Sequence, residues 1–148
     1  MNSEDIKNLN SILEGEYIAI KSFAALIMHA DDVNAKNELK KIQETHKQHA
    51  SQLSTKIQEL GGNPHRGIGI DGMVSETISN IKHIGTTDNV SYLREALKEE
   101  HIGTKAVNEM LTSNTDFSSD QLLNEIISHH QTNINSLNNL INTYGNAQ

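Results

Sequence analysis

The chain repeats itself once, at an offset of 84 residues. The same shift carries positions 16, 46 and 49 onto positions 100, 130 and 133, and it carries the apolar positions around them onto one another. The polar pairs are Glu16 with Glu100, His46 with His130, and His49 with Asn133. The apolar pairs include Leu9 with Leu93, Leu13 with Leu97, Phe23 with Val107, Leu39 with Leu123, Ile42 with Ile126 and Leu53 with Leu137. Such a chain is expected to fold as two copies of one unit, with any shared site on a pseudo-twofold axis between them.

The apolar spacing inside each copy is that of an α-helix. From Ile6 to Ile27, apolar residues step alternately by three and four positions, which places them on one face of a helix with 3.6 residues per turn. Similar stripes cover residues 39–60, 93–111 and 123–140. We therefore expect amphipathic helices over residues 3–29, 33–60, 89–112 and 119–144.

The connections between these helices predict the topology. A few residues around Asp31 and Asp32 join the first two helices, and the turn 113–118 joins the last two, so each pair must form an antiparallel hairpin. Residues 61–88 lie between the hairpins and begin at the helix stop Gly61-Gly62. This segment is long enough to run the length of a bundle.

The fold expected from this topology is all-α and forms a single domain over residues 1–148. It is a four-helix bundle made of two antiparallel helical hairpins, 3–60 and 89–144, related by a pseudo-twofold axis. One long crossover, residues 61–88, joins the hairpins and is expected to contain a short helix from about Met73 to Ile84.

Composition limits the classes of partner. A net charge of −7, from 12 Lys and Arg against 19 Asp and Glu, argues against nucleic acid or an anionic membrane surface as the main partner. The absence of cysteine excludes disulfides, thiolate metal sites and a cysteine nucleophile. No apolar run approaches the length of a signal sequence core or a membrane span, so a cytoplasmic protein is expected.

Six polar residues interrupt the apolar stripes near the middle of the helices, where a bundle core normally holds leucine. They are Glu16, His46, His49, Glu100, His130 and Asn133. An unpaired carboxylate in an apolar core costs several kcal/mol, so these groups must satisfy one another or bind a cation. His46 and His49 are three residues apart, the offset of the Glu-x-x-His pairs that build metal sites in bundle cores.

Imidazole and carboxylate ligands together suit zinc, iron, manganese, nickel or copper. Two carboxylates with three neutral imidazoles would leave a divalent ion close to neutral. We therefore expect a divalent transition metal in the core, namely iron, zinc or manganese, as one or two ions. The alternative is a metal-free network of Glu–His hydrogen bonds that fixes the register of the helices.

Four segments carry a resemblance to a known family: 13–20 (LEGEYIAI), 46–53 (HKQHASQL), 58–64 (QELGGNP) and 99–105 (EEHIGTK). On these segments the chain resembles the ferritin-like superfamily, and within it an uncharacterised family of small bacterial four-helix-bundle proteins. The resemblance covers nearly the whole chain. It implies a carboxylate-bridged di-iron or di-manganese centre used for oxygen or peroxide chemistry, iron oxidation or hydroxylation. On that pattern Glu16 and Glu100 match the single glutamates of the first and third helices, and His49 matches the histidine of the first Glu-x-x-His.

The chain departs from this pattern at three positions. His46 and His130 stand where superfamily members carry the glutamates of Glu-x-x-His, and Asn133 stands where they carry the second histidine. Neutral imidazoles cannot bridge two cations as carboxylates do, so a single ion is the simpler expectation. Its candidate ligands are Glu16, His46, His49, Glu100 and His130, although the two glutamates could still bridge a pair of ions.

Two classes of function remain open. The first is a metal-binding protein of redox or oxidase type, with oxygen or peroxide as substrate. The second is a non-catalytic bundle, either structural, stress-related or a metal buffer, whose site is structural or vestigial. Tyr17 and His101, each next to a core glutamate, could assist the site or pack at its rim, and His129 is expected to face a neighbour or solvent. The expected partner is the metal ion, and a homodimer is one expected assembly.

Overall fold

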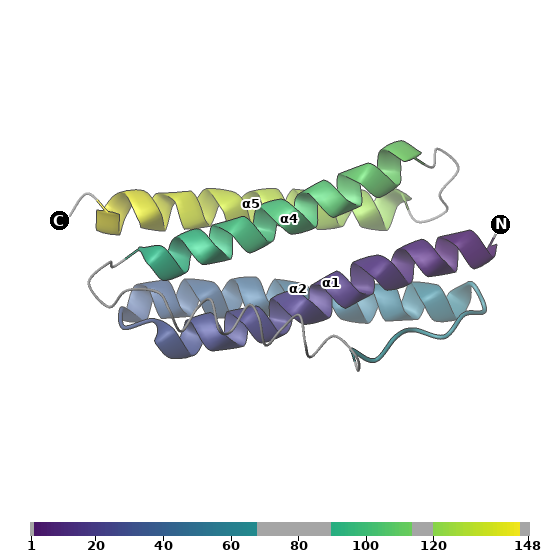
Figure 1. The fold of residues 1–148 in the computed structure, drawn as a ribbon, viewed down its shortest axis with the longest axis horizontal. Helices are drawn as coiled ribbons and strands as arrows, with labels where there is room; N and C mark the ends of the chain where they lie inside the picture. The colour runs from purple at the N-terminus through teal and green to yellow at the C-terminus, as the bar shows by residue number, and fades with distance from the viewer. Residues whose placement is uncertain (1, 68–89, 114–119, 146–148) are drawn as a thin grey trace.

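The computed structural model describes residues 2–67, 90–113 and 120–145. Four helices make up most of these residues: α1 (Asn2–His29), α2 (Val33–Glu59), α4 (Ser91–Ser113) and α5 (Asp120–Gly145). They lie together as a bundle (Figure 1). Apolar spacing predicted all four, with bounds within two residues of those observed. The short helix expected from Met73 to Ile84 lies outside the described residues.

The helices pair as two antiparallel hairpins. Helix α1 packs on α2, α4 packs on α5, and the hairpins meet through α1 with α4 and α2 with α5. In Figure 1 the chain runs in opposite directions along α1 and α2, and again along α4 and α5. Helices α2 and α4 run the same way, which a short turn could not connect. None of the described helices is both long and apolar enough to cross a membrane.

Local chemistry sets the ends of α2. The Asp32 side chain caps its start by accepting a hydrogen bond from the Ala35 N–H at 2.8 Å. At the other end the helix stops at Glu59. Gly61 follows with φ +87°, a conformation that favours glycine, and the Gly62 N–H donates to the Ile57 carbonyl at 2.9 Å. The helix stop predicted at Gly61-Gly62 is therefore confirmed.

Two apolar clusters form the core, one toward each end of the bundle, and all four helices contribute to both. The first includes Phe23, Leu26, Leu39, Ile42, Leu93 and Leu137. The second includes Leu9, Leu13, Leu53, Ile57, Val107, Leu123 and Ile126. On every helix, the polar residues that interrupt the apolar stripe lie between these two sets. The bundle thus holds a polar level at its middle, between two apolar layers.

Candidate metal centre

All six polar residues predicted from the sequence are buried in this middle level. Their exposed fraction is 7% or lower in each case. Helix α1 supplies Glu16, α2 supplies His46 and His49, α4 supplies Glu100, and α5 supplies His130 and Asn133. Each occupies a position of the apolar stripe, so the packing that buries the neighbouring leucines also buries these side chains.

His46 lies between the two glutamates. Its Nδ1 is 2.6 Å from Glu16 Oε2 and its Nε2 is 2.6 Å from Glu100 Oε1. Because carboxylate oxygens accept, both ring nitrogens donate, and the ring carries a positive charge. Burial by itself lowers the pKa of His46, but the charge of Glu16 and the hydrogen bonds to both carboxylates outweigh it and raise the pKa to about 10. The protonated His46 ring therefore donates one hydrogen bond to each glutamate.

Glu16 has two further imidazoles beside it. His49 Nδ1 is 3.5 Å from Glu16 Oε2, and His130 Nε2 is 3.4 Å from Glu16 Oε1. Burial raises the pKa of Glu16, but the charge of His46 and the surrounding imidazoles hold it well below its usual range. Burial lowers the pKa of His49, which favours the neutral ring that a metal requires.

Several buried polar atoms have no hydrogen-bond partner within the part of the chain that the structure describes. At this level they are His49 Nδ1, both ring nitrogens of His130, Glu100 Oε2 and Asn133 Nδ2. Leaving such a group unsatisfied costs about 1–3 kcal/mol. Both nitrogens of His46 are therefore satisfied, while the nitrogens of His49 and His130 that face Glu16 are not.

These orphaned nitrogens fit the donor set of a metal ion. The ligand atoms of Glu16, His46, His49 and His130 all lie within 4.8 Å of one another. Ligands about 2.0–2.1 Å from a tetrahedral ion lie about 3.4 Å apart, which matches the separations of Glu16 from His49 and His130. The Glu16–His46 contact is shorter because a hydrogen bond joins these two groups. A cation that replaced the proton on His46 would meet four ligands.

Glu100 and Asn133 are placed differently from these four. Glu100 contacts the ring nitrogen of His46 that faces away from Glu16, so the imidazole separates the two carboxylates. The structure thus places the Glu100 carboxylate against His46 and not against Glu16. Asn133 is buried three residues after His130 on α5.

His129 is a contact that sequence reasoning did not assign to the site. It is exposed, yet its Nδ1 is 2.7 Å from His49 Nε2 and the two rings stack with centroids 5.0 Å apart. The outer nitrogen of His49 is thus held, which leaves Nδ1 on the side of Glu16. His129 lies three residues after Ile126 and four before Asn133, both of which are buried. This helical spacing places His129 beside the core face and could have indicated its contact with the site.

The other two residues left open from the sequence lie elsewhere. Tyr17 is half-buried and packs against the connection that follows α2, because a Cβ on Gly67 would come within 3.2 Å of its ring. His101 is exposed on α4.

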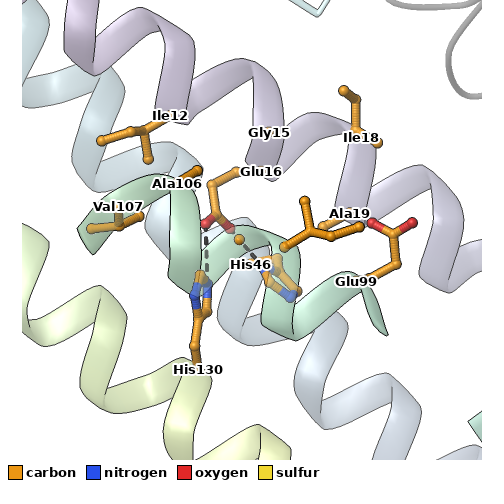
Figure 2. Close-up of a pocket in the computed structure, with 12 residues that line it drawn as sticks. Ile12, Gly15, Glu16, Ile18, Ala19, His46, Glu99, Ala106, Val107 and His130 are labelled. Carbon is orange, nitrogen blue, oxygen red and sulfur yellow. Dashed lines mark hydrogen bonds and ion pairs between the residues drawn. The ribbon is translucent and has the colours of Figure 1, made fainter. Parts of the chain in front are cut away.

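A cavity of about 310 Å³ reaches the site from between α1 and α4. Figure 2 shows Glu16, His46 and His130 at its inner end, with α1 and α4 on either side. Small residues make this space: Gly15 and Ala19 on α1, and Gly103 and Ala106 on α4. Glu99 also lines it, and sequence reasoning did not single this residue out.

Comparison with known proteins relates the whole chain to bundles of one fold. The family described as "Domain of unknown function (DUF2383)" matches residues 4–113. No match was found among curated proteins. A two-domain protein from Anabaena variabilis, with DJ-1/ThiJ/PfpI-like and ferritin-like domains, is similar with a TM-score of 0.80 and 19% identity. That similarity covers 100% of this chain and 39% of the Anabaena chain, so this chain spans about two fifths of that protein.

A second solved structure is similar over almost its full length. The bacterioferritin-related protein of Bacteroides fragilis, described as a dodecameric thioferritin, has a TM-score of 0.79 and 17% identity, covering 99% of this chain and 89% of that one. At these identities the likeness shows the fold alone. The fold is a ferritin-like four-helix bundle, and its buried Glu/His cluster is suited to metal binding.

Proposed function

The chain belongs to the DUF2383 family of domains of unknown function, and from its site we propose that it binds one divalent transition-metal ion through Glu16, His46, His49 and His130. The observation that carries the proposal is the gathering of four buried ligand atoms from three helices within 4.8 Å of one another. Orphaned nitrogens on two of these residues add to it, because an ion would satisfy them.

The donor types and the charges around the four residues suit a divalent transition-metal ion. Three imidazoles with one carboxylate suit iron or zinc, and manganese is the third candidate. Glu16 and Glu100 together balance a divalent charge when the imidazoles are neutral. Glu100 would hold the outer N–H of His46, and His129 would hold the outer nitrogen of His49, as such partners do in metal sites.

A redox role is the finer part of the proposal. When bound, iron or manganese supplies one-electron chemistry with oxygen or peroxide. The cavity between α1 and α4 ends on three of the four ligands, so a small molecule could approach an ion from that side. A zinc ion closed by all four ligands would instead be structural.

One observation favours the alternative of a metal-free structural core. The protonated His46 ring already bonds both glutamates and offsets part of their charge, as a cation would. On that alternative the Glu–His network fixes how the two hairpins pack, and the site is vestigial.

Elemental analysis of protein produced without a histidine tag tests the proposal. We expect about one transition-metal ion per chain in the wild type and a loss of most of it in His130→Ala. His65→Ala is the matched control, because His65 also pairs with a glutamate, Glu14, but does so at the exposed surface. Equal metal content in wild type and His130→Ala would assign the metal to surface histidines. If the wild type neither retains metal on purification nor binds added metal at pH 7.5, the metal-free hydrogen-bond network is favoured.

The redox part has its own test. Protein loaded anaerobically with Fe(II) and then exposed to oxygen or peroxide should develop ferric absorption, which Glu16→Gln abolishes. Metal binding without that absorption would assign a structural ion and reject the redox role.

A further inference from the structure

The cavity beside the site has apolar walls and a polar inner end. The walls are formed by Ile12, Ile18, Ala19, Ile102, Ala106 and Val107. The inner end is formed by Glu16, His46 and His130 (Figure 2). Ile102 is 55% exposed, which places part of the wall at the protein surface. The space therefore connects the outside of the bundle to the candidate ligands.

The size of this cavity exceeds what oxygen or peroxide needs. A water molecule takes a share of about 30 Å³ in the liquid, and an apolar cavity of about 150 Å³ is large enough to bind benzene. At about 310 Å³, the cavity falls at the lower end of the range for small-molecule sites, about 300–1,000 Å³. It has room for an organic molecule of one or two rings.

The charges around the cavity disfavour an anion. Glu99 lines it and is half-buried. Glu16 lies at the inner end. Among the described lining residues none is Lys or Arg, and both nitrogens of His46 are engaged by glutamates. An anionic ligand would thus meet the carboxylates of Glu16 and Glu99, and the described lining offers it no Lys or Arg.

We propose that this cavity binds a small uncharged apolar organic molecule and presents it to the metal site. The presentation to an ion rests on the proposed function, whereas the binding itself depends only on the walls. Burial of apolar surface drives this binding, because removing the apolar surfaces of the ligand and of the cavity walls from water is favourable.

Gly15 offers a way to fill the cavity without disturbing the core. A Cβ at Gly15 meets no atom within 4 Å, so a longer side chain there can extend into the cavity. Ala106 lines the opposite wall on α4. Ala24 is an exposed α1 residue outside the lining, which makes Ala24→Leu the matched control for Gly15→Leu.

The test uses toluene and benzoate, which share a ring and differ in charge, with chelator-treated protein. Calorimetry and the methyl NMR signals of Ile12, Ile18 and Ile102 report binding. We expect saturable toluene binding, at least tenfold weaker binding of benzoate, at least tenfold weaker toluene binding to Gly15→Leu, and none of this loss in Ala24→Leu. Ala106→Leu repeats the test from the other wall if Gly15→Leu does not fold.

Three results would overturn the inference: no saturable toluene binding, benzoate binding as tight as toluene, or full toluene affinity in the filled variants. Because the protein is metal-free in this test, a failure of the proposed metal site would leave toluene binding unchanged. A failure of the cavity would likewise leave the elemental analysis unchanged.

Discussion

At the scale of single residues, His46 controls the charge of the site. Its two nitrogens each bond a buried carboxylate, and a proton on the ring neutralises them in part. A metal ion bound by this ring must displace that proton from one nitrogen. Proton and metal therefore compete for the same place, and pH should act in opposite directions on the metal-free and metal-bound protein.

The first prediction concerns the stability of metal-free protein. The folded pKa of His46, about 10, lies above its unfolded value, so its contribution is fully present below pH 6.5 and is lost as pH rises toward about 10. The free energy of unfolding, measured with urea and a chelator at pH 6.5, 8 and 9.5, should fall over this range. His46→Gln should show a flatter profile and be less stable by about 3–5 kcal/mol at pH 6.5, because it leaves buried carboxylates uncompensated.

Two neighbours act on the acid side, which is why the test stays above pH 6.5. Glu16 has a lowered pKa, so its contribution is present above its usual value and is lost as pH falls. His49 also has a lowered pKa, and protonating it on unfolding reduces stability below pH 6.5. Identical slopes for wild type and His46→Gln above pH 6.5 would contradict the role given to His46.

Metal affinity should change with pH in the other direction. One proton must leave His46 for each ion bound, so the dissociation constant for Zn²⁺ should fall by about tenfold per pH unit between pH 6.5 and 8.5. Competition with a chromophoric chelator measures it at each pH. An affinity independent of pH over this interval would exclude His46 as a ligand.

Asn133→His tests the position where the chain departs from the ferritin-like pattern. Asn133 is buried and lies three residues after His130 on α5, and its Nδ2 has no hydrogen-bond partner among the described residues. If the side chain reaches the ion, a histidine adds a nitrogen ligand, and Zn²⁺ affinity should rise by at least tenfold. Unchanged affinity in a folded variant would place residue 133 outside the ligand set, whereas the nearby exposed change Gln131→His should have no effect.

The sequence was sufficient to find the six polar positions, because the 84-residue offset and the helical period both point to them. It was not sufficient to separate their roles. Whether Glu100 meets Glu16 or His46 depends on how far apart the helices pack, and the His129 contact depends on a side-chain rotamer at the rim. Glu99 was missed because it lies outside the apolar stripe, where a carboxylate is common, and only the structure shows that it lines a cavity.

At the scale of helices, α4 passes close to the His130 side chain of α5 at Gly103. A Cβ at Gly103 would lie 3.1 Å from Cε1 of His130, tighter than ordinary contact, whereas a Cβ at Gly15 meets nothing within 4 Å. Glycine at residue 103 therefore permits the position of the His130 ring. The bounds of all four helices followed from the apolar period, but this close approach did not, because it depends on the packing of α4 against α5.

Gly103→Ala and Gly15→Ala form a matched pair that tests this point. Both replace a glycine inside a helix, which by itself favours the helix by about 1 kcal/mol. Gly15→Ala should therefore raise the thermal midpoint and keep the Zn²⁺ affinity. Gly103→Ala should gain less stability and lose affinity by about tenfold, because the added methyl displaces the His130 ring. Equal affinities in the two variants would show that the ring does not depend on Gly103.

At the scale of the whole molecule, the middle polar level divides one core into two apolar clusters. Packing of α1 with α4 and of α2 with α5 brings the matched halves of the repeat together there. The long connection, the single domain over residues 1–148, the homodimer and the cytoplasmic location stay predictions. The short helix expected in the connection falls outside the described residues.

The central claim is that the buried Glu/His cluster binds a metal ion, and anomalous X-ray diffraction tests it most directly. Crystals of tag-free protein grown with the retained metal, measured on both sides of its absorption edge, should show one anomalous peak per chain. We predict the peak at about 2.0–2.2 Å from ligand atoms of Glu16, His46, His49 and His130. A peak at exposed histidines such as His65 or His101, or no peak in the core at saturating metal, would contradict the account.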